Sequence, residues 1–463
     1  MTQSHLRHVF AALFALCAIL PVAGQRLLGG DFSLLPTYGQ RQVVYRDSAG
    51  RPVYFLPFVV DEGGWNAARV RLFVDPSQAP AQAKGEGVLQ SLDYVIPLCK
   101  LVREQGMRLM LDFHYSDTWA DPGKQFVPHR WQDAPATALA DSVGAYTRAT
   151  LLRLRHEGIV PDLVQVGNEV TFGMLWPTGR VDPGRDDRWD VFARLLRSGV
   201  EACRELCPKA RVIIHTEHAQ DWKATRGFYD RLARYGVDYD VIGLSYYPMW
   251  HGTIGHLNVV LDSLEARYPD KDLMIVETAA YYSHQNDRWT TDPDAYGQYF
   301  PISPDGQREF ALELVSMLNK HPRVSGLFWW MPEENESGRP VIESWINRGL
   351  FSNATGRVLP AFYELAKFRA HDRGAFLQKP EHQYSPSTVI IWYDNSHPDV
   401  KPRLLEAIAR HGCTVTYDYQ NFNAVAVSMP RGMSVDDAIV LFSRVNGVLQ
   451  VSRDEINTLQ GRP

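Results

Sequence analysis

Between Asp162 and Glu169 the chain reads DLVQVGNE, a short apolar run that ends in two polar residues. Short apolar runs that are rich in valine and bounded by glycine are typical of buried strands. Asn168 and Glu169 stand where this strand ends, and side chains of this kind are seldom used to fill a core. The stretch therefore predicts a buried strand that delivers a carboxylate to the edge of a sheet.

Runs of the same kind recur along the chain, each followed by a longer amphipathic stretch. We expect strands near 29–34 and at Ala68–Val74, Arg108–Phe113, Asp162–Gly167, Val212–His215, Val241–Tyr246, Leu273–Glu277 and Gly326–Trp330. We expect helices such as Ser91–Gln105, Ala138–Glu157, Trp189–Leu206, Gly255–Tyr268 and Gln307–Asn319. Gly106 and Gly158 follow the first two helices, where a terminating glycine is common. This alternation predicts an α/β fold, a (β/α)8 TIM barrel that spans residues 25–370.

Polar or aromatic residues end nearly every expected strand. They are Asp75, His114, Asn168, Glu169, His215, Tyr246, Tyr247, Glu277, Trp329 and Trp330. The C-terminal strand ends of a (β/α)8 barrel meet on one face, so these distant residues are expected to form one site. An open doubly wound sheet is the rival layout, but no glycine-rich phosphate loop follows the first strand to support it.

The C-terminal part of the chain has a different pattern. Residues 371–387 are polar, contain Pro380 and Pro386, and are expected to be a linker. Residues 388–463 then follow the order strand, helix, strand, strand, helix, strand, which predicts a small ferredoxin-like α+β module. This module weakly resembles the propeptide inhibitors of subtilisin-type proteases, a likeness that identifies no chemistry. A structural or docking role is the simplest interpretation.

The N-terminus has the features of a secretory signal. Arg7 precedes the apolar run Val9–Leu20, and small residues follow up to Gly24. The run is shorter than the roughly 20 residues that cross a bilayer, and no later segment is expected to be transmembrane. We therefore expect cleavage after residues 1–24 and a secreted or periplasmic protein. Lipidation at Cys17 is disfavoured, because Leu16 stands where a small residue is preferred.

The composition narrows the range of partners. Over 463 residues the net charge is only −5, so no electrostatic feature points to nucleic acid. The 12 tryptophans suit the apolar faces of sugars, although they also suit a core. Cys99, Cys203, Cys207 and Cys413 form no paired motif for zinc, and the two neighbours in Val200–Cys207 are expected to be buried thiols rather than a disulfide.

Two glutamates occupy strand ends that suit acid/base and nucleophilic chemistry. Glu169 follows the fourth expected strand and Glu277 ends the seventh. Retaining cleavage of a glycosidic bond uses two carboxyl groups about 5 to 5.5 Å apart, one as acid/base and one as nucleophile. A single glutamate after a strand is more often a capping or ion-paired residue. Two of them at these strand positions, the first preceded by Asn168, favour catalysis.

Several stretches resemble a known family. Gly167-Asn168-Glu169 and Glu277 are similar to the catalytic glutamates of clan A of the retaining glycoside hydrolases. Within that clan the chain resembles glycoside hydrolase family 53, the arabinogalactan endo-β-1,4-galactanases, over about residues 29–370. The similar stretches are 29–33, 70–76, 165–169, 242–248 and, as the most specific, 111–125, which reads LDFHYSDTWADPGKQ.

The resemblance implies roles for individual residues. It implies that Glu169 is the acid/base and Glu277 the nucleophile, and that Asn168 donates to the sugar 2-hydroxyl. It further implies that Arg71 holds Glu277 ionised and that Tyr247 orients it. The remaining candidate contacts to substrate are Asp31, Asp112, His114, Trp119, His215, Trp329 and Trp330. Trp176, in the loop after the fourth strand, is a further ring that could stack on a sugar.

The expected chemistry requires no cofactor and no catalytic metal. Some family members bind calcium after the seventh strand, but Asp287, Asp292 and Asp294 in this chain match no ligand spacing. The expected partner is β-1,4-galactan of plant pectin, or its oligosaccharides. Two alternatives stay open: another clan A endo-glycanase such as a β-mannanase, and a catalytically inactive barrel that only binds glycans.

Overall fold

The computed structural model describes residues 26–182, 184–284, 299–338, 340–342, 345–368, 384–395, 397–419 and 423–455. The expected signal segment with Cys17, the three aspartates at 287, 292 and 294, and most of the expected linker lie outside these residues. The chain divides into two compact units, residues 1–371 and 372–463. No helix in the described ranges has the length and apolar character needed to cross a bilayer.

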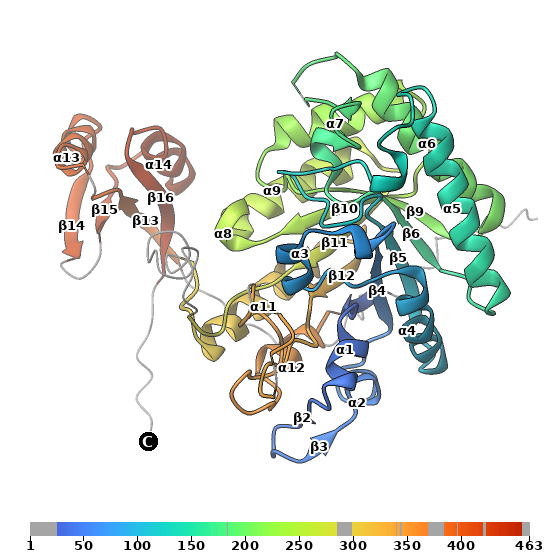
Figure 1. Ribbon diagram of the computed structural model, residues 1–463. Coiled ribbons are helices and arrows are strands. Elements are labelled where there is room, and N and C mark those ends of the chain that lie inside the picture. Colours follow the sequence, from blue (N-terminus) through green and yellow to red (C-terminus); the bar gives the residue numbers. More distant parts are fainter. Residues whose placement is uncertain are drawn as a thin grey trace, which may run out of the picture. The chain divides into compact units, whose positions relative to one another are not determined.

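The first unit is a closed barrel of parallel strands surrounded by helices (Figure 1). The strands are β1 (Leu27–Asp31), β4 (Ala67–Leu72), β5 (Arg108–Phe113), β6 (Leu163–Val166), β9 (Arg211–Thr216), β10 (Val241–Tyr246), β11 (Asp272–Thr278) and β12 (Val324–Trp330). They pair in the order β1-β12-β11-β10-β9-β6-β5-β4, and β4 closes on β1. The TIM barrel predicted from the sequence is confirmed.

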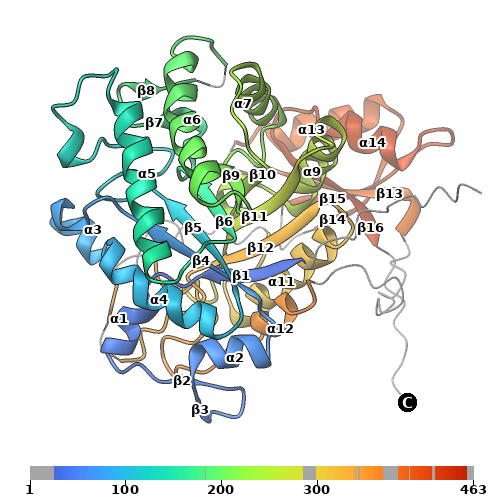
Figure 2. The same ribbon diagram turned by 90° about the vertical axis from the view of Figure 1, so that its right-hand side faces the viewer.

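Helices cover the outside of the barrel, as the view in Figure 2 also shows. They are α2 (Phe55–Asp61), α4 (Leu92–Glu104), α5 (Leu139–His156), α6 (Trp189–Leu206), α7 (Trp222–Arg234), α9 (Ile254–Arg267), α11 (Pro304–Leu318) and α12 (Ala361–Leu365). Short helices α1 (Leu35–Gln40), α3 (Ala81–Gly85) and α8 (Pro248–His251) lie in loops. Gly106 and Gly158 follow α4 and α5 with positive φ, which confirms both as helix-terminating glycines.

The first strand differs from its expected position. It runs from Leu27 to Asp31 instead of from about residue 29 to 34, because the Asp31 carboxylate accepts the backbone N–H of Ser33 and turns the chain. Gly29 is required inside this strand: a Cβ there would stand 2.1 Å from the Ala67 carbonyl oxygen of β4. Close approach of the two backbones is what closes the barrel at this seam.

Alternation along the strands decides what fills the barrel. Ala67, Met110, Leu163, Ile213, Val241, Met274, Val276 and Phe328 form one buried cluster that draws on seven strands. Because side chains two apart share a face of a strand, the residues two positions further on in four of these strands point the same way. These residues are Arg69, Asp112, Gln165 and His215, and all four are fully buried. An apolar layer therefore supports a polar layer beneath the C-terminal strand ends.

The second unit is described by itself. It contains β13 (Tyr384–Tyr393), α13 (Val400–Arg410), β14 (Thr414–Tyr419), β15 (Ala424–Ser428), α14 (Val435–Phe442) and β16 (Val448–Glu455). The strands form one sheet in the order β14-β15-β13-β16, with antiparallel neighbours. Its own core includes Val389, Leu404, Val425 and Phe442. The expected sequence of strands and helices is present.

Cys99, Cys203, Cys207 and Cys413 are all buried free thiols. Cys203 and Cys207 are buried, as the sequence predicted.

Candidate active site

A cleft of about 610 Å³ opens at the C-terminal ends of the barrel strands. Glu169, after β6, and Glu277, in β11, both line it. Four tryptophans line the same cleft, namely Trp119, Trp250, Trp330 and Trp345. The volume is typical of a pocket for a small organic ligand, and the combination of two carboxyl groups with flat aromatic rings suits a sugar chain.

The backbone that presents Glu169 has an unusual conformation. Gly167 has φ of 84°, a value that costs glycine little, and Glu169 itself has φ of 46° in the left-handed region. Non-glycine residues in this region store strain and occur preferentially at functional sites. Tyr115 after β5 and Met331 after β12 also have positive φ, at 50° and 53°. Strained turns at three strand ends thus surround the cleft.

Glu277 is held by a cation and a hydroxyl. Arg69 Nη2 lies 2.8 Å from Glu277 Oε1, and the Tyr247 hydroxyl donates to Glu277 Oε2 at 3.0 Å. Burial raises the pKa of Glu277 above its ordinary value, and the negative charges of Asp112 and Asp31 add to this rise. Arg69 and the Tyr247 hydrogen bond oppose it. Both contacts favour the ionised carboxylate, which is the form that a nucleophile needs.

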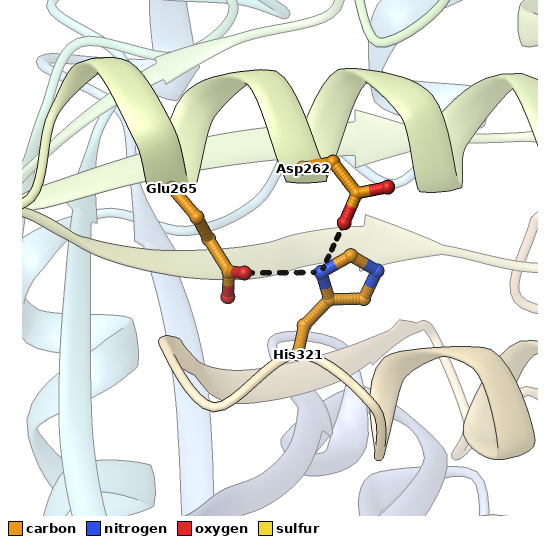
Figure 3. Close-up of side chains that lie close together, drawn as sticks. All are labelled: Asp262, Glu265 and His321. Carbon is orange, nitrogen blue, oxygen red and sulfur yellow. Dashed lines mark hydrogen bonds and ion pairs between the residues drawn. The ribbon is translucent and has the colours of Figure 1, made fainter.

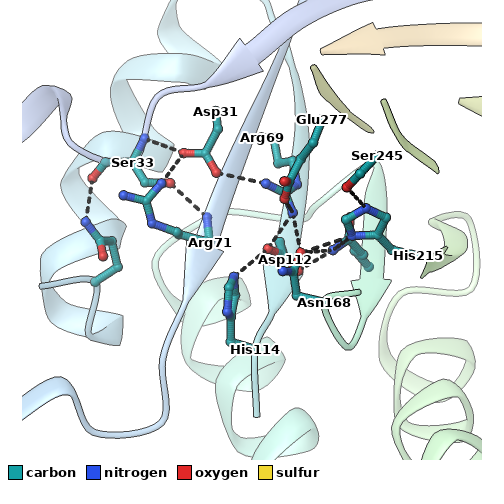
Figure 4. A network of polar contacts seen from close by, with 12 residues as sticks. Asp31, Ser33, Arg69, Arg71, Asp112, His114, Asn168, His215, Ser245 and Glu277 are labelled. Atoms are coloured by element: carbon teal, nitrogen blue, oxygen red, sulfur yellow. Dashed lines mark hydrogen bonds and ion pairs between the residues drawn. The ribbon is translucent and has the colours of Figure 1, made fainter. Parts of the chain in front are cut away.

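Arg69 is the centre of a buried polar network below the cleft (Figure 4). Its guanidinium binds Asp31 Oδ2 at 3.0 Å, Asp112 Oδ2 at 2.8 Å and the Asn168 side-chain oxygen at 2.8 Å, in addition to Glu277. Arg69 and Asp112 are fully buried. Since one nitrogen, Nη2, contacts both Asn168 and Glu277, the ends of β6 and β11 are tied to each other through β4.

The expected role of Arg71 is wrong. Arg71 binds Asp31 Oδ1 at 2.8 Å, and its guanidinium lies 4.6 Å from the ring of Trp119. The cation at Glu277 is Arg69, two residues earlier on the same strand face. The strand period places both arginines inside the barrel, and only the positions of the neighbouring strands decide which one reaches Glu277. Burial opposes the ionisation of Asp31, but both arginines together lower its pKa below the ordinary value.

Glu169 has no cationic partner of this kind. The Ser245 hydroxyl donates to its Oε1 at 2.7 Å, and no described residue forms an ion pair with it. Burial and the charges of Glu277 and Glu217 raise the pKa of Glu169 well above the ordinary value. These surroundings favour the protonated form of the carboxyl group, which is the form that a general acid needs.

The other expected site residues fall into two groups. His114, Trp119, Asn168, Tyr247 and Trp330 line the cleft. Asp31, Arg71, Asp112 and His215 are buried in the network beneath the cleft and are not among its lining residues. Trp329 is buried as well, and its Nε1 donates to the Arg348 carbonyl at 2.8 Å. The second group supports the site and is not placed to touch a ligand in the cleft.

Trp176 also lies away from the cleft lining. Its Nε1 donates to the Phe172 carbonyl at 2.9 Å, and the guanidinium of Arg180 stacks on its ring at 4.5 Å. The expected contact between Tyr247 and Glu277 is present, as described above. The Asn168 amide donates to the Ala120 carbonyl at 2.8 Å, so its donation to a sugar hydroxyl stays a prediction.

Several cleft residues were not expected from the sequence. Glu217 lies two residues beyond His215, and its carboxylate accepts from Thr171 at 2.6 Å and contacts His218 at 2.9 Å. A search for polar residues that continued two positions past the strand end at His215 could have identified Glu217. Arg69 could have been found from the alternation in β4.

Trp345 and Arg348 reach the cleft through a long loop that gives no sequence signal. Glu334 holds this loop by accepting backbone N–H groups of Asn347, Arg348 and Gly349. The guanidinium of Arg348 lies between rings, 4.4 Å from Trp330 and 4.8 Å from Trp345. Only tertiary structure brings this loop beside Trp330.

Among the described residues, one group has a spacing that could hold a metal ion. Asp262 and Glu265 on α9 face His321 (Figure 3), with possible ligand atoms within 4.8 Å of one another. His321 is buried, and its Nδ1 lies 3.4 Å from Glu265 and 3.7 Å from Asp262. None of the three lines the cleft. These contacts link α9 to the turn before β12.

Known proteins resemble this chain over the barrel. The model of glycosyl hydrolase family 53 matches residues 27–365. An uncharacterised protein of Niallia circulans is 34% identical over 361 residues, which cover 73% of this chain and 93% of that protein. An arabinogalactan endo-β-1,4-galactanase of Thermothelomyces thermophilus is 31% identical over 312 residues, covering 66% of this chain and 88% of the relative.

Solved structures agree with these matches. The family 53 catalytic domain of Ignisphaera aggregans superposes with a TM-score of 0.67 at 28% identity, over 74% of this chain and 96% of that one. A structure from a study of two fungal β-1,4-galactanases superposes with a TM-score of 0.63 at 29% identity, over 73% and 98% of the two chains. This chain belongs to glycosyl hydrolase family 53.

Proposed function

We propose that this protein is an endo-β-1,4-galactanase that cleaves the β-1,4-galactan of pectic arabinogalactan with retention of configuration. The proposal rests on one observation, namely that the two glutamates of the cleft have different hydrogen-bond and charge partners. Glu277 has Arg69 and Tyr247 as partners. Among the residues that the structure describes, Glu169 has neutral Ser245 as its side-chain partner and negative charges nearby. This inequality suits one nucleophile and one acid.

The reaction follows from these assignments in two displacements. The Glu277 carboxylate attacks the anomeric carbon, while Glu169 gives its proton to the departing glycosidic oxygen. The C–O bond to the leaving sugar breaks as the bond to Glu277 forms. Glu169, now a carboxylate, then takes a proton from water, whose oxygen attacks the anomeric carbon and releases Glu277. Glu169 thus regains from water the proton that it gave to the leaving sugar, and the reaction needs no cofactor or metal.

Arg69 and Tyr247 have a second part in this scheme. They stabilise the Glu277 carboxylate before attack and again when it leaves the sugar, because each contact is strongest with the anion. The four tryptophans of the cleft offer apolar faces to successive sugar rings. The galactose preference is supported by the named relatives, of which the Thermothelomyces thermophilus protein is an arabinogalactan endo-β-1,4-galactanase.

Two further expectations belong to the same proposal. We propose that residues 1–24 direct export, so that the enzyme meets its polymer outside the cytoplasm or in the periplasm. The strand order β14-β15-β13-β16, with a helix after the first and third strands in chain order, supports a ferredoxin-like second unit. Its role is proposed to be structural or in docking, because the residues of the cleft all lie in the first unit.

The test uses the purified chain on linear β-1,4-galactan. We expect galacto-oligosaccharides of several lengths early in the reaction, and proton NMR should show the β-anomer as the first product. Hydrolysis of mannan with galactan left intact would reassign the enzyme as a mannanase. Binding of galactan without turnover would indicate an inactive barrel, and a first-formed α-anomer would contradict the nucleophile.

A further inference from the structure

The oxygen atoms of Glu169 have different surroundings. Oε1 accepts the Ser245 hydroxyl at 2.7 Å, and Ser245 is fully buried in β10. Oε2 makes no hydrogen bond to any described residue, and the side chain lines the cleft. One oxygen is therefore fixed against the barrel wall and the other is free for a ligand.

A second buried residue stands behind Ser245. His215 Nε2 lies 2.8 Å from the Ser245 hydroxyl oxygen, and the imidazole is fully buried (Figure 4). Burial and the nearby charge of Arg69 hold the pKa of His215 well below its usual range, so the ring is neutral and carries one proton. The position of that proton decides the direction of every hydrogen bond between His215 and Glu169.

Donors around Nδ1 of His215 locate the proton. The backbone N–H of Glu169 points at Nδ1 from 3.3 Å, and no other acceptor faces it within the described chain. The Gln165 amide nitrogen lies 3.1 Å from Nδ1; its identity is fixed because it also donates to the Asp112 carboxylate at 2.6 Å. Nδ1 therefore accepts, and the ring proton sits on Nε2.

One contact favours the other tautomer. Nδ1 lies 3.0 Å from the Asn168 side-chain oxygen, which could accept a proton from it. That oxygen already accepts from Arg69 at 2.8 Å and from Gln165 at 3.1 Å. A proton on Nδ1 would leave the Glu169 N–H without this acceptor, and an unsatisfied donor of this kind is destabilising. The Nε2–H form is the one that satisfies more groups.

We propose that His215 and Ser245 form a positioning pair that confines the acid proton of Glu169 to Oε2, the oxygen on the cleft side. His215 Nε2–H donates to Ser245, and the single Ser245 proton is thereby directed at Glu169 Oε1. An oxygen that accepts such a bond is the carbonyl-like oxygen of the acid, so the O–H forms at Oε2. Both residues keep their protons throughout the cycle. The inference rests on the acid/base role proposed for Glu169.

The pair also acts on the charge of Glu169. The groups that bear on this carboxyl are Glu277 from β11, Glu217 beyond β9 and Asp121 after β5, all of which disfavour ionisation. Ser245 is the group that opposes them, because its hydrogen bond favours the carboxylate. Removing the hydroxyl should therefore slow proton delivery and at the same time raise the pKa of Glu169. A merely structural serine would not produce this combination.

The decisive variant is Ser245→Ala, with Ser245→Cys as a milder change and Ser325→Ala as the matched control. Ser325 also lies on a barrel strand, but its hydroxyl donates to the Leu273 carbonyl outside the cleft. We expect kcat/KM on galactan to fall about 10- to 100-fold in Ser245→Ala, the loss expected for a hydrogen bond to a charged group. An aryl galactoside with a good leaving group needs little protonation and should lose far less.

The pH readout separates positioning from structure. In Ser245→Ala the alkaline limb of kcat/KM should move to higher pH, because the carboxylate of Glu169 loses a donor. The alkaline limb of Ser245→Cys should lie between those of the wild type and Ser245→Ala, and the limb of Ser325→Ala should match that of the wild type. Equal losses on both substrates with an unmoved limb would overturn the proposal. A limb that moves to lower pH would show that Glu169 donates to Ser245, which reverses the proposed direction.

A measurement without substrate keeps this inference apart from the proposed function. Carboxyl ¹³C NMR of labelled glutamate, assigned with Glu169→Gln, reports the pKa of Glu169 directly. A higher pKa in Ser245→Ala supports the pair, and an unchanged or lower value contradicts it, even if the wild type hydrolyses no galactan. Unfolding curves of each variant check that the fold is kept.

Discussion

Glu277 and Glu169 are the same residue type in one cleft, yet the barrel surrounds them in opposite ways. Around Glu277 the strands supply a buried guanidinium and a phenolic hydroxyl. Around Glu169 they supply a serine hydroxyl and other carboxylates. Because the contacts of Glu277 favour its charged form, while the charges near Glu169 disfavour ionisation, the proposed roles follow from the surroundings and not from the residues themselves.

The largest effect should come from Glu277→Ala, which removes the nucleophile. We expect kcat on galactan to fall on the order of 10⁵-fold or more, as in other enzymes that lose their nucleophile. Added azide should restore turnover and give a product of inverted configuration. The fold should survive, since Arg69 keeps Asp31 and Asp112 as partners. Substantial activity without azide would refute the assignment.

Glu169→Ala should be less severe and should depend on the substrate. We expect a fall of about 10²- to 10⁴-fold on galactan, the usual contribution of a general acid. On an aryl galactoside with a good leaving group the first step should persist, and azide should yield a product of retained configuration. Equal losses on both substrates would contradict the acid role.

The two arginines of β4 sharpen the comparison further. Arg69→Met leaves Glu277 and Asp112 without their cation, and breaking a buried pair typically costs about 3–5 kcal/mol of unfolding free energy. Arg69 favours the charged form of Glu277, so its removal should raise the pKa of Glu277 and move the acidic limb of kcat/KM to higher pH.

Arg71→Met is the matched control for this change. It removes a buried cation of the same size that binds Asp31 and not Glu277. Denaturant unfolding should show a loss of stability for both variants, but the acidic limb should move only for Arg69→Met. If the acidic limb moved equally for both variants, the effect would arise from the overall electrostatic field inside the barrel and not from the contact between Arg69 and Glu277.

The smallest effect is expected from removal of the second unit. A chain that ends after residue 371 keeps the closed barrel and every residue that lines the cleft. Its kcat/KM on short galacto-oligosaccharides should equal that of the full chain. A pronounced loss would give residues 372–463 a part in catalysis that the cleft itself does not indicate.

The fold could be predicted because its signals are local. Strands such as Arg108–Phe113 and Val241–Tyr246 have the bounds expected from the sequence, since apolar runs flanked by helices leave little choice. The first strand was displaced because a single side-chain contact, Asp31 to the Ser33 N–H, ended it early. Boundaries depend on such contacts more than on patterns.

The site was predictable only where residues end a strand. Glu169 and Glu277 were found this way, but Trp329, at the end of β12, is buried away from the cleft. The sequence predicted Arg71 instead of Arg69 as the partner of Glu277. Both arginines lie on the same face of β4, and the sequence does not show at which level along the barrel axis each one meets the neighbouring strands. Trp345 and Arg348 come from a loop that carries no periodic signal.

The sequence alone determined which side chains point into the barrel, because alternation along a strand is a property of the chain. Tertiary structure alone decided which of those side chains meet. Eight strands must close with a particular register before Arg69 stands beside Glu277 and Ser245 beside Glu169. The pKa difference between the two glutamates therefore belongs to the assembled barrel, since charge and burial act through space and not along the chain.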